Sequence, residues 1–217
     1  IMLDGRPNSG AALGNIAFDR WNNQLFVSDL ETGMIHRLNI ADGSELGRYD
    51  HGAQGRTSFT DAATGTPVSL PAVNFDAATQ ARITDCAEGA FAATPQCWNV
   101  ADFRRRVWGL GLRRDEATGE VRLYYATWGS QGFGNPDWAA AAEDQRNTMW
   151  SIALSSAGDF NTASVRREFV LPDFFTSAED IARHGASHPV SDIAFPVLSA
   201  QNVMIAAERG GLRNLGL

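Results

Sequence analysis

The sequence predicts an all-β protein, and three observations support this fold class. Short apolar runs recur along the 217 residues, and polar clusters that hold many of the 21 glycines separate them. Glycine supplies the positive φ angle that tight turns between antiparallel strands need. The same succession of short strands and turns also occurs more than once. With 44% hydrophobic residues, the chain is long enough to bury a substantial core.

The first repeat, residues 14–50, reads as four antiparallel strands joined by tight turns. Its third strand alternates apolar and polar residues, as a strand with one buried face does. The separators at 31–33 (Glu-Thr-Gly) and 41–43 (Ala-Asp-Gly) have the composition of hairpin turns. The four predicted strands are residues 16–18, 24–28, 34–40 and 44–49.

The pattern recurs at residues 107–171 and starts a third time at residues 190–217. The tripeptide Ile-Ala-Phe stands unchanged at 16–18 and at 193–195. Residues 121–127 (Val-Arg-Leu-Tyr-Tyr-Ala-Thr) are rich in β-branched and aromatic side chains, which favour strands. The predicted strands of these repeats are residues 107–112, 121–127, 148–154 and 164–171, followed by 190–195 and 203–206.

Repeated four-stranded meanders are typical of β-propeller blades. The first repeat carries Asn-Ile-Ala-Phe-Asp at 15–19, Gln-Leu-Phe-Val-Ser-Asp at 24–29 and Gly-Met-Ile-His-Arg-Leu at 33–38. In these segments it resembles a blade of the NHL, strictosidine-synthase-like and SMP-30-like group of propellers. The resemblance extends over about 110 residues in three blades and identifies a blade type, not one member. It implies that residues 1–217 form a single, incomplete β-propeller segment.

The repeats are spaced more widely than in that group, whose blades recur every 40 to 50 residues or so. Here the first strands of successive repeats lie about 90 and 80 residues apart, so we predict long insertions. Asp137 is placed to cap a helix over Trp138–Gln145, and residues 176–179 (Thr-Ser-Ala-Glu) have a capping-box pattern. The predicted insertions are residues 51–106, 129–147 and 172–189.

Three blades do not close a ring, because a propeller needs at least four. An open propeller exposes an apolar blade face and unpaired strand edges. We therefore expect the sequence to be part of a longer chain, or its missing blades to come from another chain.

Charge and composition exclude several classes of function. The formal net charge is −7, which disfavours general attraction to nucleic acid or to anionic lipid. All 18 basic residues are Arg, so Schiff-base chemistry and a P-loop Lys are excluded. No apolar run reaches the roughly 20 residues that a membrane-spanning helix needs.

The two cysteines, Cys86 and Cys97, lie in the first insertion. A disulfide between them would close a short loop and stabilise it by roughly 2–3 kcal/mol. Two free thiols are the alternative. The bridge would indicate an extracellular, periplasmic or cell-surface protein.

Two sets of residues are candidates for binding. Asn15 and Asp192 occupy equivalent places before or within the first strands of repeats one and three, and Glu208 ends a second strand. Metal-dependent lactonases that resemble this blade type hold Ca²⁺ near such strand ends, and oxygen ligands suit that cation. The second repeat has Trp108-Gly109 there, which supplies no ligand, and hydrogen bonding to strand-entry backbone is the alternative role.

The second set joins a basic run to two aromatic residues. The run Arg104-Arg105-Arg106, together with Arg113 and Arg114, would contact a phosphate, an acidic glycan or an acidic protein. Trp128 and Trp138 would stack on sugar or anchor a partner. Pairing of the arginines with nearby Asp102 and packing of the tryptophans at the blade edge are the alternatives.

We predict a non-catalytic scaffold or binding module that presents inserted loops to a protein partner or to other subunits of an assembly. The scaffold pattern is strong, whereas each catalytic set is incomplete and fold alone does not specify an activity. A Ca²⁺-dependent hydrolase or lyase is the first alternative, and carbohydrate binding is the second. Among the remaining polar residues, Asp29 is expected to cap a turn, His36 to face solvent or pair within its sheet, and His51 to lie in a polar loop.

Overall fold

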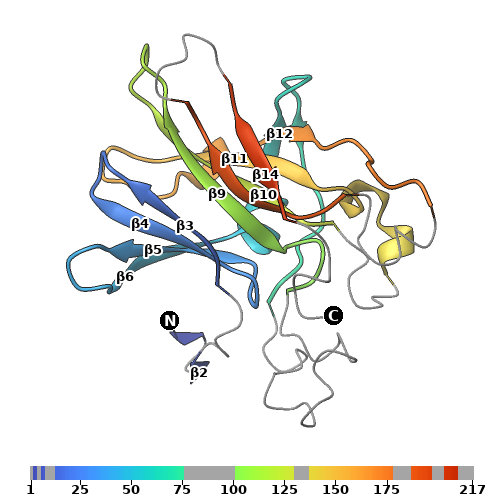
Figure 1. The fold of residues 1–217 in the computed structure, drawn as a ribbon, viewed down its shortest axis with the longest axis horizontal. Helices are drawn as coiled ribbons and strands as arrows, with labels where there is room; N and C mark the ends of the chain where they lie inside the picture. The colour runs from blue at the N-terminus through green and yellow to red at the C-terminus, as the bar shows by residue number, and fades with distance from the viewer. Residues whose placement is uncertain are drawn as a thin grey trace.

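The computed structural model describes residues 2–3, 6–7, 13–75, 101–129, 137–177, 187–196 and 203–209. Its fold is mostly β, as predicted, with sheets of four, six and two strands and a separate short hairpin (Figure 1). The strands are Met2–Leu3 (β1), Arg6–Pro7 (β2), Leu13–Asp19 (β3), Gln24–Asp29 (β4), Met34–Asn39 (β5), Glu45–Asp50 (β6), Phe59–Asp61 (β7), Pro67–Val68 (β8), Val107–Arg114 (β9), Val121–Thr127 (β10), Thr148–Ala153 (β11), Arg166–Val170 (β12), Val190–Ala194 (β13) and Ile205–Glu208 (β14). Short helical turns occupy His51–Gly55 (η1), Trp138–Ala140 (η4), Ala142–Asp144 (η5) and Thr162–Ser164 (η6).

The first sheet is the predicted meander, with antiparallel order β3-β4-β5-β6. Gly33 and Gly43 have φ angles of 70° and 72°, and they close the last two hairpins in the conformation that glycine favours. The turn of the first hairpin, between β3 and β4, contains no glycine and is stabilised by a side chain. Asn23 has a φ of 53°, and the carboxylate of Asp19 accepts hydrogen bonds from the backbone N–H groups of Trp21 and Asn22.

The second sheet contains the predicted meander β9-β10-β11-β12. It is larger than expected, because the hairpin β7–β8 continues it beyond β12. β7 pairs with β12 in parallel, and Arg167 on β12 donates hydrogen bonds of 2.7 and 3.0 Å to the Asp61 carboxylate on β7. The predicted insertion 51–106 therefore contributes two short strands to the second sheet and is not a loop throughout. Strands of two and three residues are too short to give a periodic signal.

The third sheet contains only β13 and β14 in the described part of the chain. Its strands begin within two residues of the positions predicted for the third repeat. The two Ile-Ala-Phe sequences thus belong to different sheets: residues 16–18 lie in β3, whereas Ile193 and Ala194 end β13 and Phe195 follows it.

The largest core lies between the first and second sheets. Alternation along each strand sends one set of side chains into this interface, and each fully buried large side chain contributes about 1.5–3 kcal/mol. At its centre the hydroxyl groups of Tyr49 and Tyr125 are 2.8 Å apart. Fully buried members of this core include Phe26, Ile35, Tyr49, Leu123, Tyr125 and Ile152.

The first strands of the three repeats meet. β9 lies against both β3 and β13, and Figure 1 shows it between β3 and the C-terminal strands. The glycines of β9 make this possible: a Cβ on Gly109 would lie 2.7 Å from the Val190 carbonyl oxygen, and one on Gly111 would lie 2.5 Å from that of Ile193. Gly109, which offers no metal ligand, is therefore one of two positions where β13 approaches the β9 backbone closely.

Candidate functional site

A cavity of about 370 Å³ opens where β3, β9 and β13 meet. We call it the junction groove. Apolar and aromatic side chains line it together with charged ones. The lining residues used below are Ile16, Phe18, Arg20, Trp21, Gly111, Arg113, Arg114, Glu116, Asp192 and Phe195.

The apolar walls of the junction groove come largely from one face of β3. Ile16 and Phe18 are 62% and 50% exposed, although both lie in the middle of a strand. Ala17, between them, points to the opposite face and packs against the core of the first two sheets. Large apolar side chains exposed side by side in a cavity are typical of a binding surface.

Three arginines supply positive charge to the junction groove. The Arg20 guanidinium lies 4.7 Å from the centroid of the Trp21 ring, and that of Arg113 lies 5.9 Å from the centroid of Phe195. Stacking on an aromatic face orients a planar guanidinium while its N–H groups stay at the edge. Arg114, at the end of β9, donates from Nε to the Gly119 carbonyl oxygen at 3.3 Å.

Two acidic residues also line the junction groove, Glu116 and Asp192. The Oδ1 atom of Asp192 accepts hydrogen bonds from the Ile193 backbone N–H at 2.9 Å and from Asn15 Nδ2 at 3.3 Å. These two donors partly compensate the negative charge of the Asp192 carboxylate. With three arginines and two carboxylates, the lining carries an excess of positive charge in a chain of net charge −7.

The structure brings Asn15 and Asp192 together, as their equivalent places in the repeats suggested. They form a hydrogen bond with each other and are not arranged as two ligands of a metal ion. Asn15 turns its Nδ2 donor, not its oxygen, toward Asp192, and that donor also reaches the Ser191 carbonyl oxygen at 2.7 Å. This is the alternative role of bonding to strand-entry backbone.

Glu208 does not join them. In the β13–β14 register Asp192 faces Ala207, so Asp192 and Glu208 point to opposite faces of this sheet. Partial burial raises the pKa of Glu208. The three residues therefore do not fit a shared Ca²⁺ site. Within the described ranges, no three His, Cys, Asp or Glu side chains are grouped to hold a metal ion.

Two arginines of the predicted basic run, Arg105 and Arg106, are buried and contact other parts of the protein. Arg105 is 1% exposed and donates to the carbonyl oxygens of Thr32 and Val73 and to the Asp50 carboxylate. Arg106 is also buried, and burial lowers its pKa to about 10. Such buried guanidinium groups hold segments of the protein together, so the idea that they contact an external phosphate is corrected.

Arg104 pairs with Asp102, the alternative anticipated for it. Its Nε and one Nη atom each donate to that carboxylate at 2.8 Å, and Asp137 lies 3.4 Å away. Hydrogen bonding to Arg104 holds the pKa of Asp102 below its usual value despite the opposing effect of burial.

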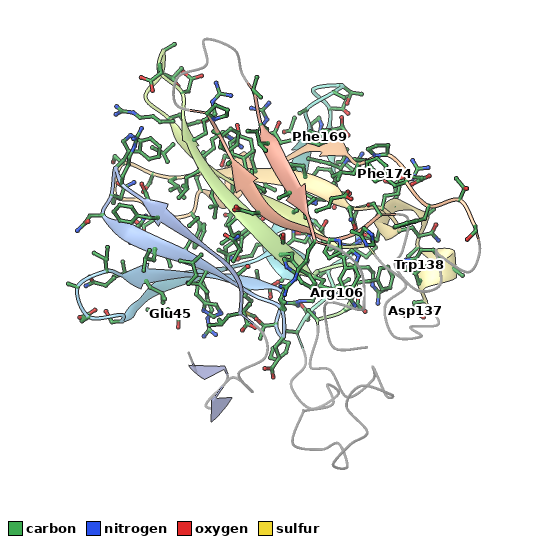
Figure 2. The ribbon with its side chains drawn as sticks, viewed as in Figure 1. Glu45, Arg106, Asp137, Trp138, Phe169 and Phe174 are labelled. Carbon is green, nitrogen blue, oxygen red and sulfur yellow. The ribbon has the colours of Figure 1, made fainter. Side chains whose placement is uncertain are left out.

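The two predicted tryptophans make contacts within the protein. Trp128 is 3% exposed, and its ring lies 5.2 Å from that of Trp108 and 5.0 Å from the Arg106 guanidinium. Trp138 is half-buried and donates from Nε1 to the Gly129 carbonyl oxygen at 2.6 Å. Figure 2 shows Arg106 near the lower middle of the molecule and Trp138 to its right. Trp128 is therefore packed inside the protein and is not free to stack on a sugar.

The segment after Asp137 differs from the predicted helix. Instead of a helix over Trp138–Gln145, it forms the two single turns η4 and η5, and the Asp137 side chain makes no capping hydrogen bond. The capping-box pattern at 176–179 lies partly outside the described residues. Cys86 and Cys97 lie wholly outside them.

Two histidines are buried, and for His36 the structure shows the second of its two predicted roles, pairing within its own sheet. His36 is fully buried on β5, with Nδ1 2.9 Å from Glu45 Oε1 and Nε2 3.6 Å from Asp29 Oδ2; Glu45 lies at the edge of the first sheet (Figure 2). His36 lies directly opposite Val27 of β4, a register that the alternation of β5 alone does not reveal. Asp29 also accepts a hydrogen bond from the Glu31 backbone N–H, as a turn cap does.

His51, expected in a polar loop, is instead buried in the aromatic core. Its Nδ1 lies 3.1 Å from the Tyr125 hydroxyl, and its ring packs 4.7 Å from that of Trp150. Burial, reinforced by the positive charges of Arg56 and Arg105, lowers the pKa of His51 to about 3. The imidazole is therefore neutral at physiological pH, and it occupies the core, not a surface site.

Comparisons with known proteins give no family for the chain. No family model matches it, and no curated protein is significantly similar to it. Among the described residues, no helix is long and apolar enough to cross a membrane.

Proposed function

We propose that the protein is a β-propeller segment that acts as a binding module, with the junction groove as its binding site. The propeller assignment is supported by two four-stranded meanders packed face to face and by the meeting of β3, β9 and β13, each the first strand of its repeat. In a propeller these are the innermost strands of three successive blades.

The observation that carries the binding function is the exposure of Ile16 and Phe18 inside a cavity. Exposed apolar side chains that lie side by side contribute little to folding, and a cluster of them in a cavity is typical of a binding site. Because Trp128, Arg105 and Arg106 are buried, the geometry favours the junction groove over the inserted loops as the surface offered to a partner.

An apolar probe tests this proposal directly. N-phenyl-1-naphthylamine is neutral and fluoresces when it enters an apolar site, so we expect it to bind the full chain. Phe18→Ser should weaken this binding by roughly fivefold, because part of the apolar contact is lost. Phe169→Ser is the matched control, since Phe169 is 46% exposed on β12, outside the junction groove (Figure 2). Absence of binding, or equal effects of the two variants, would contradict the proposal.

We further propose that the protein is exported, on the basis of the predicted Cys86–Cys97 disulfide. A thiol assay on denatured, unreduced protein should find no free thiol. Detection of two thiols would remove this argument.

A further inference from the structure

We propose that the junction groove selects an amphipathic organic anion: a small ligand with an apolar ring or chain and one carboxylate, sulfonate or sulfate group. This inference rests on the proposed binding function and adds the chemical class of the ligand. The apolar body would lie against Ile16 and Phe18, and the anionic group would reach Arg20 and Arg114.

The two arginines are available for such a group. Arg20 and Arg114 are both exposed, and within the described ranges neither guanidinium has a carboxylate at ion-pair distance. Arg20 is held against Trp21, and Trp21 and Arg114 also line a second, adjoining cavity together. The two guanidinium groups are thus carried by residues that lie on the same side of the junction groove.

The placement of these arginines follows from local structure. Arg20 lies in the turn that the Asp19 carboxylate fixes through its bonds to Trp21 and Asn22, so its position does not depend on a partner. Arg114 ends β9, where its Nε bond to Gly119 spans the following turn. Guanidinium groups held this way lose little conformational freedom when they bind a carboxylate or sulfate, and such charge-assisted bonds are strong.

The negative groups facing the junction groove do not cancel this attraction. Asp192 is engaged by Asn15 and by its own strand, and Arg113 offsets Glu116 in the charge of the lining. A volume of about 370 Å³ suits a ligand of one or two rings, at the lower end of small-molecule sites of about 300–1,000 Å³.

A pair of probes with one aromatic frame tests the selectivity. 8-Anilino-1-naphthalenesulfonate carries a sulfonate that N-phenyl-1-naphthylamine lacks. By fluorescence titration of the full chain at low salt, we expect the sulfonate to bind about tenfold more tightly than the neutral probe. This preference should shrink at high salt, because exposed charges are screened.

Variants assign the preference to the two arginines. The double variant Arg20→Gln, Arg114→Gln should bind both probes equally, whereas Arg20→Lys, Arg114→Lys should keep most of the preference. Arg48→Gln, an exposed arginine on β6 outside the junction groove, is the matched control and should bind like the parent chain. Far-ultraviolet circular dichroism checks that each variant is folded.

The outcomes separate the two proposals. Equal affinity of the parent chain for the two probes, or a preference unchanged in the glutamine double variant, overturns the anion inference while the binding function stands. Failure of both probes to bind, or binding that does not respond to Phe18→Ser, overturns the binding function and this inference together.

Discussion

Neighbouring apolar side chains on the two faces of β3 have opposite surroundings. On one face Ala17 packs, beside Phe26 of the neighbouring strand, into the core between the first two sheets. On the other, Ile16 and Phe18 stand in the junction groove and remain largely exposed. Strand alternation explains why neighbouring side chains point to opposite faces of β3. Only the side chain that packs into the core stabilises the fold. The comparison separates apolar residues that stabilise this protein from those that are available to a ligand.

The largest effect should come from removing an aromatic ring on the core side. Phe26→Ala is expected to lower the free energy of unfolding by about 3–5 kcal/mol, because it leaves a cavity in a packed interface. Phe18→Ala, on the groove side, should change it by less than about 1 kcal/mol. Denaturant unfolding of both variants measures the difference. Equal losses would mean that the two faces do not differ as described.

Acid should weaken the core side through His51. Its pKa is about 3 in the folded protein and near 6.5 when unfolded, so below pH 6.5 the unfolded chain takes up a proton that the folded chain does not. This contribution to stability is complete above pH 6.5 and declines as pH falls toward 3. Between pH 6.5 and 4.5 we expect a loss of about 2–3 kcal/mol. Chemical denaturation at several pH values measures it, and His51→Gln should flatten the profile; an unchanged slope in that variant would assign the effect elsewhere.

A smaller effect should arise where β9 forms the floor of the junction groove. Gly111→Ala places a Cβ against Ile193 and should cost about 1–3 kcal/mol through overpacking. It should also speed hydrogen exchange in β13 and β14. Gly47→Ala on β6 is the control, because nothing lies within 4 Å of a Cβ there. Similar stability losses in both variants would indicate that β13 does not approach β9 as closely as described.

The smallest effect concerns the sequence-predicted metal residues. Since Asn15 and Asp192 bond to each other and Glu208 points away, millimolar Ca²⁺ should leave the melting temperature within about 1 °C of its value in chelator. Asp192→Ala should not change this result. A calcium-dependent stabilisation that Asp192→Ala abolishes would restore the metal-site interpretation.

The sequence could predict the strands because hydrophobic alternation and glycine turns are local signals. The whole meander β3–β6 and the four strands β9–β12 lie within a few residues of their predicted positions. The hairpin β7–β8 could not be predicted, because its pairing with β12 is made across about 100 residues of chain. Propensity within so short a strand carries no information about a distant partner.

The binding residues were harder to predict than the strands, for a physical reason. Arg104, Arg105 and Arg106 form one basic run in the sequence, yet the backbone directs Arg105 and Arg106 inward to carbonyl groups and aromatic rings. Burial of a charge depends on tertiary partners that no local pattern contains. Nothing in the sequence links Arg20 to Arg114, because only the meeting of β3 and β9 brings them to one cavity.

The most direct test is to map where the anionic probe binds. In an NMR titration of isotope-labelled protein with 8-anilino-1-naphthalenesulfonate, we predict that the largest amide shifts occur at Ile16, Phe18, Gly111 and Phe195 around the junction groove. Shifts centred on Trp138 and the turns η4 and η5, with the amides of β3 unchanged, would contradict the account.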